Sequence, residues 1–114
     1  MARVTTHVLD TARGTPGADI KIDFFVVGGE RRLIGSAVTD RDGRADLGGQ
    51  SGVSPGVYEL VFHAGDYFRR NGIALPDPPF VDDVTVRFGV AEANGRYHVP
   101  LLVSPWSYST YRGS

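Results

Sequence analysis

Apolar and polar side chains alternate along much of the chain, which predicts β-strands rather than helices. The clearest case is residues 84–90, where valine or phenylalanine at every second position alternates with Thr85, Arg87 and Gly89. The same period of two begins residues 20–27. Because successive side chains of a strand point to opposite faces, each such segment should bury one face and expose the other.

Dipeptides that contain glycine predict the turns between strands. Gly28-Gly29 predicts a hairpin whose return strand is residues 32–38. Asp42-Gly43 predicts a tight turn, which places Arg44 at the start of a short strand, and Asn94-Gly95 predicts a second hairpin. Residues 13–17 and 48–56, rich in glycine, are expected to be loops.

One short helix is expected at residues 67–70, with Asp66 as its N-terminal cap and Asn71-Gly72 as its left-handed stop. Besides this helix, the sequence predicts about eight strands. They are residues 3–9, 20–27, 32–38, a short strand from Arg44, 57–63, 84–90, 97–103 and 106–111. The pattern predicts an all-β fold, a two-sheet antiparallel β-sandwich formed by a single domain over residues 1–114.

Composition supports this class and narrows the partners. Fifteen glycines and seven prolines in 114 residues disfavour long helices. The absence of cysteine excludes disulfides, a cysteine nucleophile and thiolate metal sites. A net charge of −1 provides no field for nucleic acid or an anionic membrane. With no export signal and no apolar run long enough for a membrane span, we expect a cytoplasmic protein without membrane or nucleic-acid partners.

Candidate chemistry rests on few residues. His7 and His98 each lie on a predicted strand, and His98 should face away from the core. Taken alone, a histidine on the outer face of a strand is more often an ordinary solvent-facing side chain, and an arginine after Asp-Gly is most often an ordinary turn residue. His63, which shares a strand face with Glu59, is a weaker candidate.

Several well-known motifs are missing from the sequence. The glycine pairs lack the strand, turn and helix context of a phosphate-binding loop, and no serine lies in a nucleophile elbow. No two histidines have the spacing of zinc ligands, although His7, His98 and a carboxylate could still meet in space. The end of the chain is unusual, because Trp106, Tyr108 and Tyr111 give it an apolar load that a frayed tail does not need.

Four segments of the chain closely resemble the 5-hydroxyisourate hydrolase family, the transthyretin-like enzymes of urate catabolism. They include His7, Arg44, His98 and the aromatic residues at the end of the chain. The segments are Thr5–Gly14, Thr39–Arg44, Gly65–Phe68 and Tyr97–Ser114. They occur in order and cover essentially the whole chain. The final Tyr-Arg-Gly-Ser is the most specific part, since it separates the hydrolases from hormone-carrying transthyretin. The segment Phe62-His63-Ala64 departs from the family pattern.

The resemblance implies a transthyretin-like sandwich assembled as a homotetramer, with active sites at subunit interfaces. The exposed aromatic residues of the last strand agree with this, because another subunit would cover them. The implied reaction is hydrolysis of 5-hydroxyisourate to 2-oxo-4-hydroxy-4-carboxy-5-ureidoimidazoline, without a cofactor or a metal.

Carried over by position, the resemblance makes His7, Arg44, His98 and Ser114 the catalytic residues. It also implies that Tyr111 and Arg112, with His7 and Arg44, bind substrate. A neutral imidazole can take a proton from water, and a guanidinium can stabilise charge on a carbonyl oxygen. Which histidine is the base stays open. The Ser114 hydroxyl and a terminal carboxylate could orient a histidine or the substrate.

A second class of function competes with the hydrolase. A transthyretin-like carrier or binding module of small molecules would share the fold but not the catalytic residues. An apolar channel with Lys or Glu would favour a carrier, whereas two histidines and an arginine favour hydrolysis.

Overall fold

The structure is a computed structural model of the chain that describes residues 1–49 and 51–114. Of the predicted loop 48–56, Gln50 lies outside the described residues. Nine strands and one helix are present among the residues described. They are β1 (Arg3–Asp10), β2 (Thr15–Pro16), β3 (Lys21–Val27), β4 (Arg32–Val38), β5 (Arg44–Asp46), β6 (Gly56–His63), α1 (Ala64–Arg70), β7 (Asp83–Val90), β8 (Arg96–Val103) and β9 (Tyr108–Thr110).

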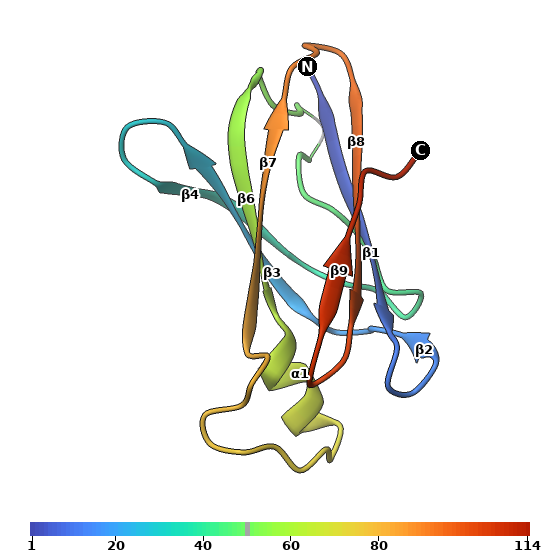
Figure 1. Cartoon of the computed structure of the whole chain (residues 1–114). Helices are drawn as coiled ribbons and strands as arrows, with labels where there is room; N and C mark the ends of the chain where they lie inside the picture. The colour runs from blue at the N-terminus through green and yellow to red at the C-terminus, as the bar shows by residue number, and fades with distance from the viewer. Residues whose placement is uncertain (50) are drawn as a thin grey trace.

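The strands form two sheets packed face to face, with α1 at one end (Figure 1). One sheet has the order β2-β1-β8-β9, and β5 pairs with β1 beside β2. The other has the order β4-β3-β6-β7. The predicted all-β sandwich with one short helix is thereby confirmed. The pairing of β1 with β8 is parallel, however, while the other pairings of the described strands are antiparallel.

The predicted hairpin at Asn94-Gly95 is wrong, because β7 and β8 belong to different sheets. The connection crosses from one layer to the other instead of folding back in the same sheet. The phenolic oxygen of Tyr97 accepts hydrogen bonds from the backbone N–H groups of Ala91 and Glu92 at 3.0 and 2.9 Å, which fixes this crossing. A turn dipeptide reverses the chain but does not determine which strand becomes the neighbour.

Other local predictions hold. β3 and β4 form the expected hairpin, with a register shift after Phe24. Gly43 and Gly72 have the positive φ angles of +80° and +79° that their turn and helix stop require. The two-residue strand β2 lies within a segment expected to be a loop, and β9 is shorter than the predicted strand at 106–111.

The helix begins three residues earlier than the sequence suggests. Ala64 is its first residue, so Asp66 lies in the first turn and is not the cap. Tyr67 and Phe68 are buried against the core. The Tyr67 hydroxyl donates a 2.7 Å hydrogen bond to Oδ2 of Asp10, which is 1% exposed. This bond ties α1 to the end of β1.

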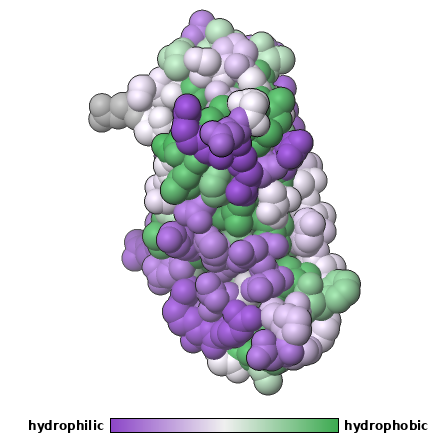
Figure 2. Space-filling view, turned by 90° about the vertical axis from the view of Figure 1, so that its left-hand side faces the viewer, coloured by the Kyte–Doolittle hydropathy of each residue, from purple (hydrophilic) through white to green (hydrophobic). Residues whose placement is uncertain are grey.

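The core lies between the inner faces of the two sheets. Its largest fully buried side chains include Phe24, Phe62 and Phe68. On β1 the even positions from Val4 to Val8 are buried, so the odd positions face outward from the five-stranded sheet. Viewed from the side of β4, the surface is largely hydrophilic with separate hydrophobic patches (Figure 2). None of the described helices is long and apolar enough to cross a membrane.

Candidate active site

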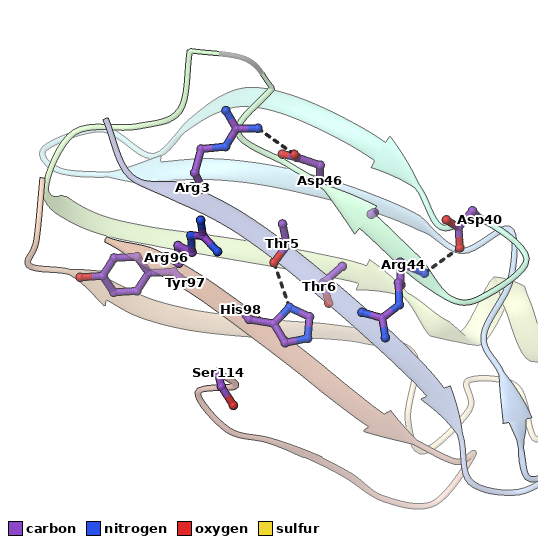
Figure 3. A pocket seen from close by; sticks show the side chains of 11 residues that line it. Arg3, Thr5, Thr6, Asp40, Arg44, Asp46, Arg96, Tyr97, His98 and Ser114 are labelled. Atoms are coloured by element: carbon purple, nitrogen blue, oxygen red, sulfur yellow. Dashed lines mark hydrogen bonds and ion pairs between the residues drawn. The ribbon is translucent and has the colours of Figure 1, made fainter. Parts of the chain in front are cut away.

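A cavity of about 650 Å³ opens on the outer face of the five-stranded sheet (Figure 3). It combines strands β1, β5 and β8 with the last residue of the chain. The lining residues are Arg3, Thr5, Thr6, Asp40, Arg44, Ala45, Asp46, Arg96, Tyr97, His98 and Ser114. Three of the predicted catalytic residues, Arg44, His98 and Ser114, are therefore brought to one cavity.

Strand register explains this convergence. His7 of β1 pairs with Arg44 of β5 in antiparallel register. Thr5 of β1 lies opposite His98 of β8 in the parallel pair. Since outward-facing side chains recur at every second residue, these four side chains share the outer face of the sheet.

His98 is held from two directions. Its Nδ1 lies 2.9 Å from the Thr5 hydroxyl oxygen, and its backbone carbonyl accepts a 2.8 Å hydrogen bond from the Gly113 N–H. Burial lowers the pKa of His98, and electrostatic repulsion of its protonated form by the neighbouring Arg44 and His7 lowers it further. The imidazole is thereby kept neutral at neutral pH, as a proton acceptor must be.

His7 lies beside the cavity and is not among its lining residues. Its Nε2 is 2.9 Å from the backbone carbonyl oxygen of Asp42. A carbonyl oxygen can only accept, so Nε2 of His7 is the donor in this bond. The bond links β1 to the turn that presents Arg44.

The turn before Arg44 is fixed by a single carboxylate. Oδ1 of Asp40 accepts hydrogen bonds from the backbone N–H groups of Asp42 and Arg44 at 2.9 and 3.0 Å. The hydrogen bond from Arg44 is the main cause of the lowered pKa of Asp40, and burial opposes it. Asp40 therefore stays ionised and locks the backbone of Arg44.

The last residues divide between two cavities. Ser114 lines the first cavity, whereas Tyr111 and Arg112 line a neighbouring one of about 290 Å³ between β7 and β8. The Arg112 guanidinium carbon lies 4.4 Å from the ring centre of Tyr97. Within one chain, Tyr111 and Arg112 are thus separated from the first cavity, and His98 borders both.

Several residues that line the cavity had no distinctive signal in the sequence. Thr5, Arg3 and Arg96 share an outward face with the histidines, and Asp46 faces the cavity from β5. The period of two on either side of His7 and His98 carries that signal. That signal becomes useful only once β1 is known to pair with β8, and the sequence did not reveal this pairing.

The third histidine belongs to a separate cluster. His63 lies with Nε2 2.8 Å from Oδ2 of Asp23 and Nδ1 3.1 Å from Oδ1 of Asp83. This cluster ties β3, β6 and β7 together across the second sheet. His63 is therefore remote from the candidate active site.

The cavity combines three kinds of group: a neutral imidazole, a guanidinium and a hydroxyl. Together they can activate water and stabilise an oxyanion, which is the chemistry of amide hydrolysis. Across residues 1–49 and 51–114, no group of three His, Asp or Glu side chains is placed to hold a metal ion.

Comparison with known proteins distinguishes the possible functions. The model of the HIUase/Transthyretin family matches residues 4–113. A 5-hydroxyisourate hydrolase of Ralstonia nicotianae is 58% identical over 118 residues, covering 100% of both chains. The solved 5-hydroxyisourate hydrolase of Klebsiella pneumoniae is similar with a TM-score of 0.85 and 28% identity, covering 100% of both chains. Transthyretin from Sparus aurata has the same TM-score at 27% identity, covering 96% of this chain and 95% of its own.

The two solved structures are equally similar in fold, so fold alone does not separate a hydrolase from a carrier. Sequence identity does separate them, because the 58% identical relative carries the hydrolase name. Since the family model and this relative both extend along the chain, the protein belongs to the HIUase/Transthyretin family.

Proposed function

We propose that the protein hydrolyses 5-hydroxyisourate to 2-oxo-4-hydroxy-4-carboxy-5-ureidoimidazoline, a step of urate degradation. The 58% identity to a 5-hydroxyisourate hydrolase over the full chain carries this proposal. The cavity that gathers Arg44, His98 and Ser114 supports it independently, because these groups suit attack of water on a cyclic amide.

His98 is the proposed general base. It lines the cavity, its pKa is lowered, and its Nε2 has no hydrogen-bond partner among the described residues. Nε2 takes a proton from water while the water oxygen bonds to the substrate carbonyl carbon. The C–N bond then breaks, and the His98 imidazolium returns the proton to the leaving nitrogen.

Arg44 is the proposed stabiliser of the negative charge that develops on the carbonyl oxygen. Its guanidinium can present two parallel N–H donors to a delocalised anion. The fixed turn at Asp40 holds its backbone during the reaction. His7 adds an N–H link to that turn and contributes to substrate binding in this proposal.

Ser114 supplies a hydroxyl at the cavity and is proposed to orient water or substrate. Tyr111 and Arg112 are proposed to bind substrate in the assembled protein, since in a single chain they face the neighbouring cavity. No cofactor takes part in the proposed reaction.

The proposed assembly is a homotetramer. β7 and β9 are the edge strands of their sheets, and they lie on the same side of the sandwich (Figure 1). Tyr108 on β9 is 51% exposed, and Trp106 and Tyr111, which flank β9 in the sequence, are 59% and 60% exposed. An edge with exposed aromatic side chains favours pairing with another copy of the chain. A cytoplasmic location stays a prediction of the sequence, which cell fractionation would test.

The direct test is the decay of freshly generated 5-hydroxyisourate, followed by ultraviolet absorbance with and without the protein. We expect strong acceleration by the natural protein and loss of most activity in His98→Asn, with unfolding behaviour preserved. A rate equal to spontaneous decay would instead support the carrier alternative. Tight binding of the intact compound without turnover would then be the expected companion result.

A further inference from the structure

The contact between Thr5 and His98 has the geometry of a positioning interaction. Thr5 Oγ1 lies 2.9 Å from Nδ1 of His98, and both side chains are partly buried (Figure 3). The two residues are opposite one another in the parallel β1–β8 pair, so the backbone fixes their separation. Across residues 1–49 and 51–114, this is the only side-chain hydrogen bond of Thr5.

Gly113 limits the imidazole from another side. A Cβ added at Gly113 would lie only 2.5 Å from Cδ2 of His98, so the ring edge occupies the space that a side chain would fill. The backbone N–H of Gly113 also binds the His98 carbonyl at 2.8 Å. The ring is therefore held by a hydroxyl at Nδ1 and by close packing at Cδ2.

A hydroxyl can donate to an unprotonated ring nitrogen or accept from a protonated one. If Thr5 donates, the proton of neutral His98 is on Nε2, and the ring cannot accept a proton at that atom. If Thr5 accepts, the proton is on Nδ1, and Nε2 carries a free lone pair. Figure 3 shows the second ring nitrogen turned toward the side of the cavity where Arg44 lies.

We propose that Thr5 is a positioning residue, whose hydroxyl accepts a hydrogen bond from the Nδ1–H of His98 and holds the tautomer with Nε2 free. This inference rests on the proposed function, because it assigns the base of that reaction to one ring nitrogen. When Nε2 takes the proton from water, the imidazolium forms a stronger, charge-assisted bond to Thr5. Thr5 thus stabilises both the reactive tautomer and the charged state that follows.

The first arm of the test reads the tautomer without substrate. The ¹⁵N NMR signals of the three histidines are assigned with His98→Asn, and the protein is measured above the pH at which His98 titrates. We expect a protonated Nδ1 and an unprotonated Nε2 for His98 in the natural protein. Thr5→Val, which keeps the shape but not the hydroxyl, should give a mixture of tautomers. A proton on Nε2 in the natural protein would overturn the proposal.

The second arm reads turnover. Thr5→Val should lower kcat by about 10- to 100-fold, the range found when the hydrogen-bond partner that orients a metal-ligating histidine is removed, with little change in KM. Thr5→Ser should retain most activity, since it keeps the hydroxyl. Thr11→Val is the matched control, because Thr11 lies outside the cavity and its hydroxyl binds the Val103 carbonyl.

The outcomes separate the two proposals. A raised KM with unchanged kcat in Thr5→Val would make Thr5 a substrate-binding residue and overturn its positioning role. An inactive natural protein that still shows the Nδ1–H tautomer would overturn the proposed function alone. If Thr5→Val does not fold, the tautomer of His98 in the natural protein and the activity of Thr5→Ser still test the proposal. A proton on Nε2 of His98 would overturn it.

Discussion

Arg44 has a fixed backbone and a side chain that is free to meet a ligand. The Asp40 carboxylate holds its N–H at 3.0 Å, while the guanidinium lines the cavity. A lysine would keep the charge but not the planar pair of donors. The role of Arg44 therefore depends on geometry as well as on charge.

We predict that Arg44→Ala lowers kcat for 5-hydroxyisourate by about 10²- to 10³-fold, which is the usual effect of removing one oxyanion donor. Arg44→Lys should recover only part of the loss. Arg41→Ala removes a neighbouring exposed arginine of the same turn and should have no effect. Unchanged kcat in Arg44→Ala would remove Arg44 from the mechanism.

His63 is the residue whose charge should matter most for stability. Both ring nitrogens face carboxylates, which only accept hydrogen bonds, so the doubly protonated ring fits best. Burial opposes the charge, but the bonds and charges of Asp23 and Asp83 outweigh it and raise the pKa of His63. The folded protein therefore binds this proton more tightly than the unfolded chain does.

It follows that the contribution of His63 to stability is complete below its unfolded pKa of about 6.5 and is lost as the pH rises through the raised folded value. The difference in unfolding free energy between the natural protein and His63→Gln should be largest near pH 6 and smaller near pH 9. Urea unfolding at both pH values measures it. A difference that grows with pH would contradict this account.

At the level of elements, one buried hydrogen bond ties the helix to the first strand. Burial raises the pKa of Tyr67 to about 12, and the hydrogen bond to Asp10 adds to the rise. The phenol therefore stays protonated and can donate to the carboxylate. The other carboxylate oxygen of Asp10 accepts the N–H groups of Ala12 and Arg13, so strand, turn and helix meet at this side chain.

Tyr67→Phe should lower the unfolding free energy by about 1.5–3 kcal/mol, because it removes a hydrogen bond to a buried charged group. Tyr58→Phe is the comparison, since it removes a hydrogen bond to the backbone carbonyl of the more exposed Ser54. Its loss should be smaller, about 0.5–1.5 kcal/mol. Equal losses in chemical denaturation would show that the carboxylate charge adds nothing.

Alternation and turn chemistry predicted most strands because these signals are local. The buried faces of β1, β7 and β8 follow directly from the period of two. Pairing is not local: the parallel contact between β1 and β8 and the separation of β7 from β8 depend on how two layers share one core. The Tyr97 hydroxyl that fixes the crossing gave no signal in a pattern of apolar and polar residues.

At the scale of the whole molecule, the candidate site also combines residues that the sequence pointed to with residues that only strand pairing reveals. Residue types and the family resemblance identified His98, Arg44 and Ser114, which the fold gathers at one cavity. Thr5 was missed because a threonine on a strand is ordinary until its partner strand is known. The places of Tyr111 and Arg112 in an assembled protein stay a prediction, as does their role.

Assembly is the property to test at this scale. Tyr108 lies on the edge strand β9 and is 51% exposed, so Tyr108→Asp should place a charge in the proposed interface. We expect light scattering to give a tetramer for the natural protein and a smaller species for the variant. Leu33→Ser, on the edge strand β4 of the other sheet, is the control for loss of an exposed apolar group. A natural protein that is monomeric at working concentrations would contradict the proposed assembly.

The parallel pairing of the first long strand with the eighth has a consequence for synthesis. The contact between Thr5 and His98 spans 93 positions, so β1 can pair with β2 and β5 long before its parallel neighbour β8 emerges from the ribosome. The β4-β3-β6-β7 sheet can form earlier, but until β8 is made it lacks the buried side chains that β8 adds to the core, which are Tyr97, Val99, Leu101 and Val103. A pause in translation just before β8 would therefore leave a nascent chain prone to aggregation. The cavity, which Arg96 and His98 of β8 line, cannot form before β8 has paired with β1.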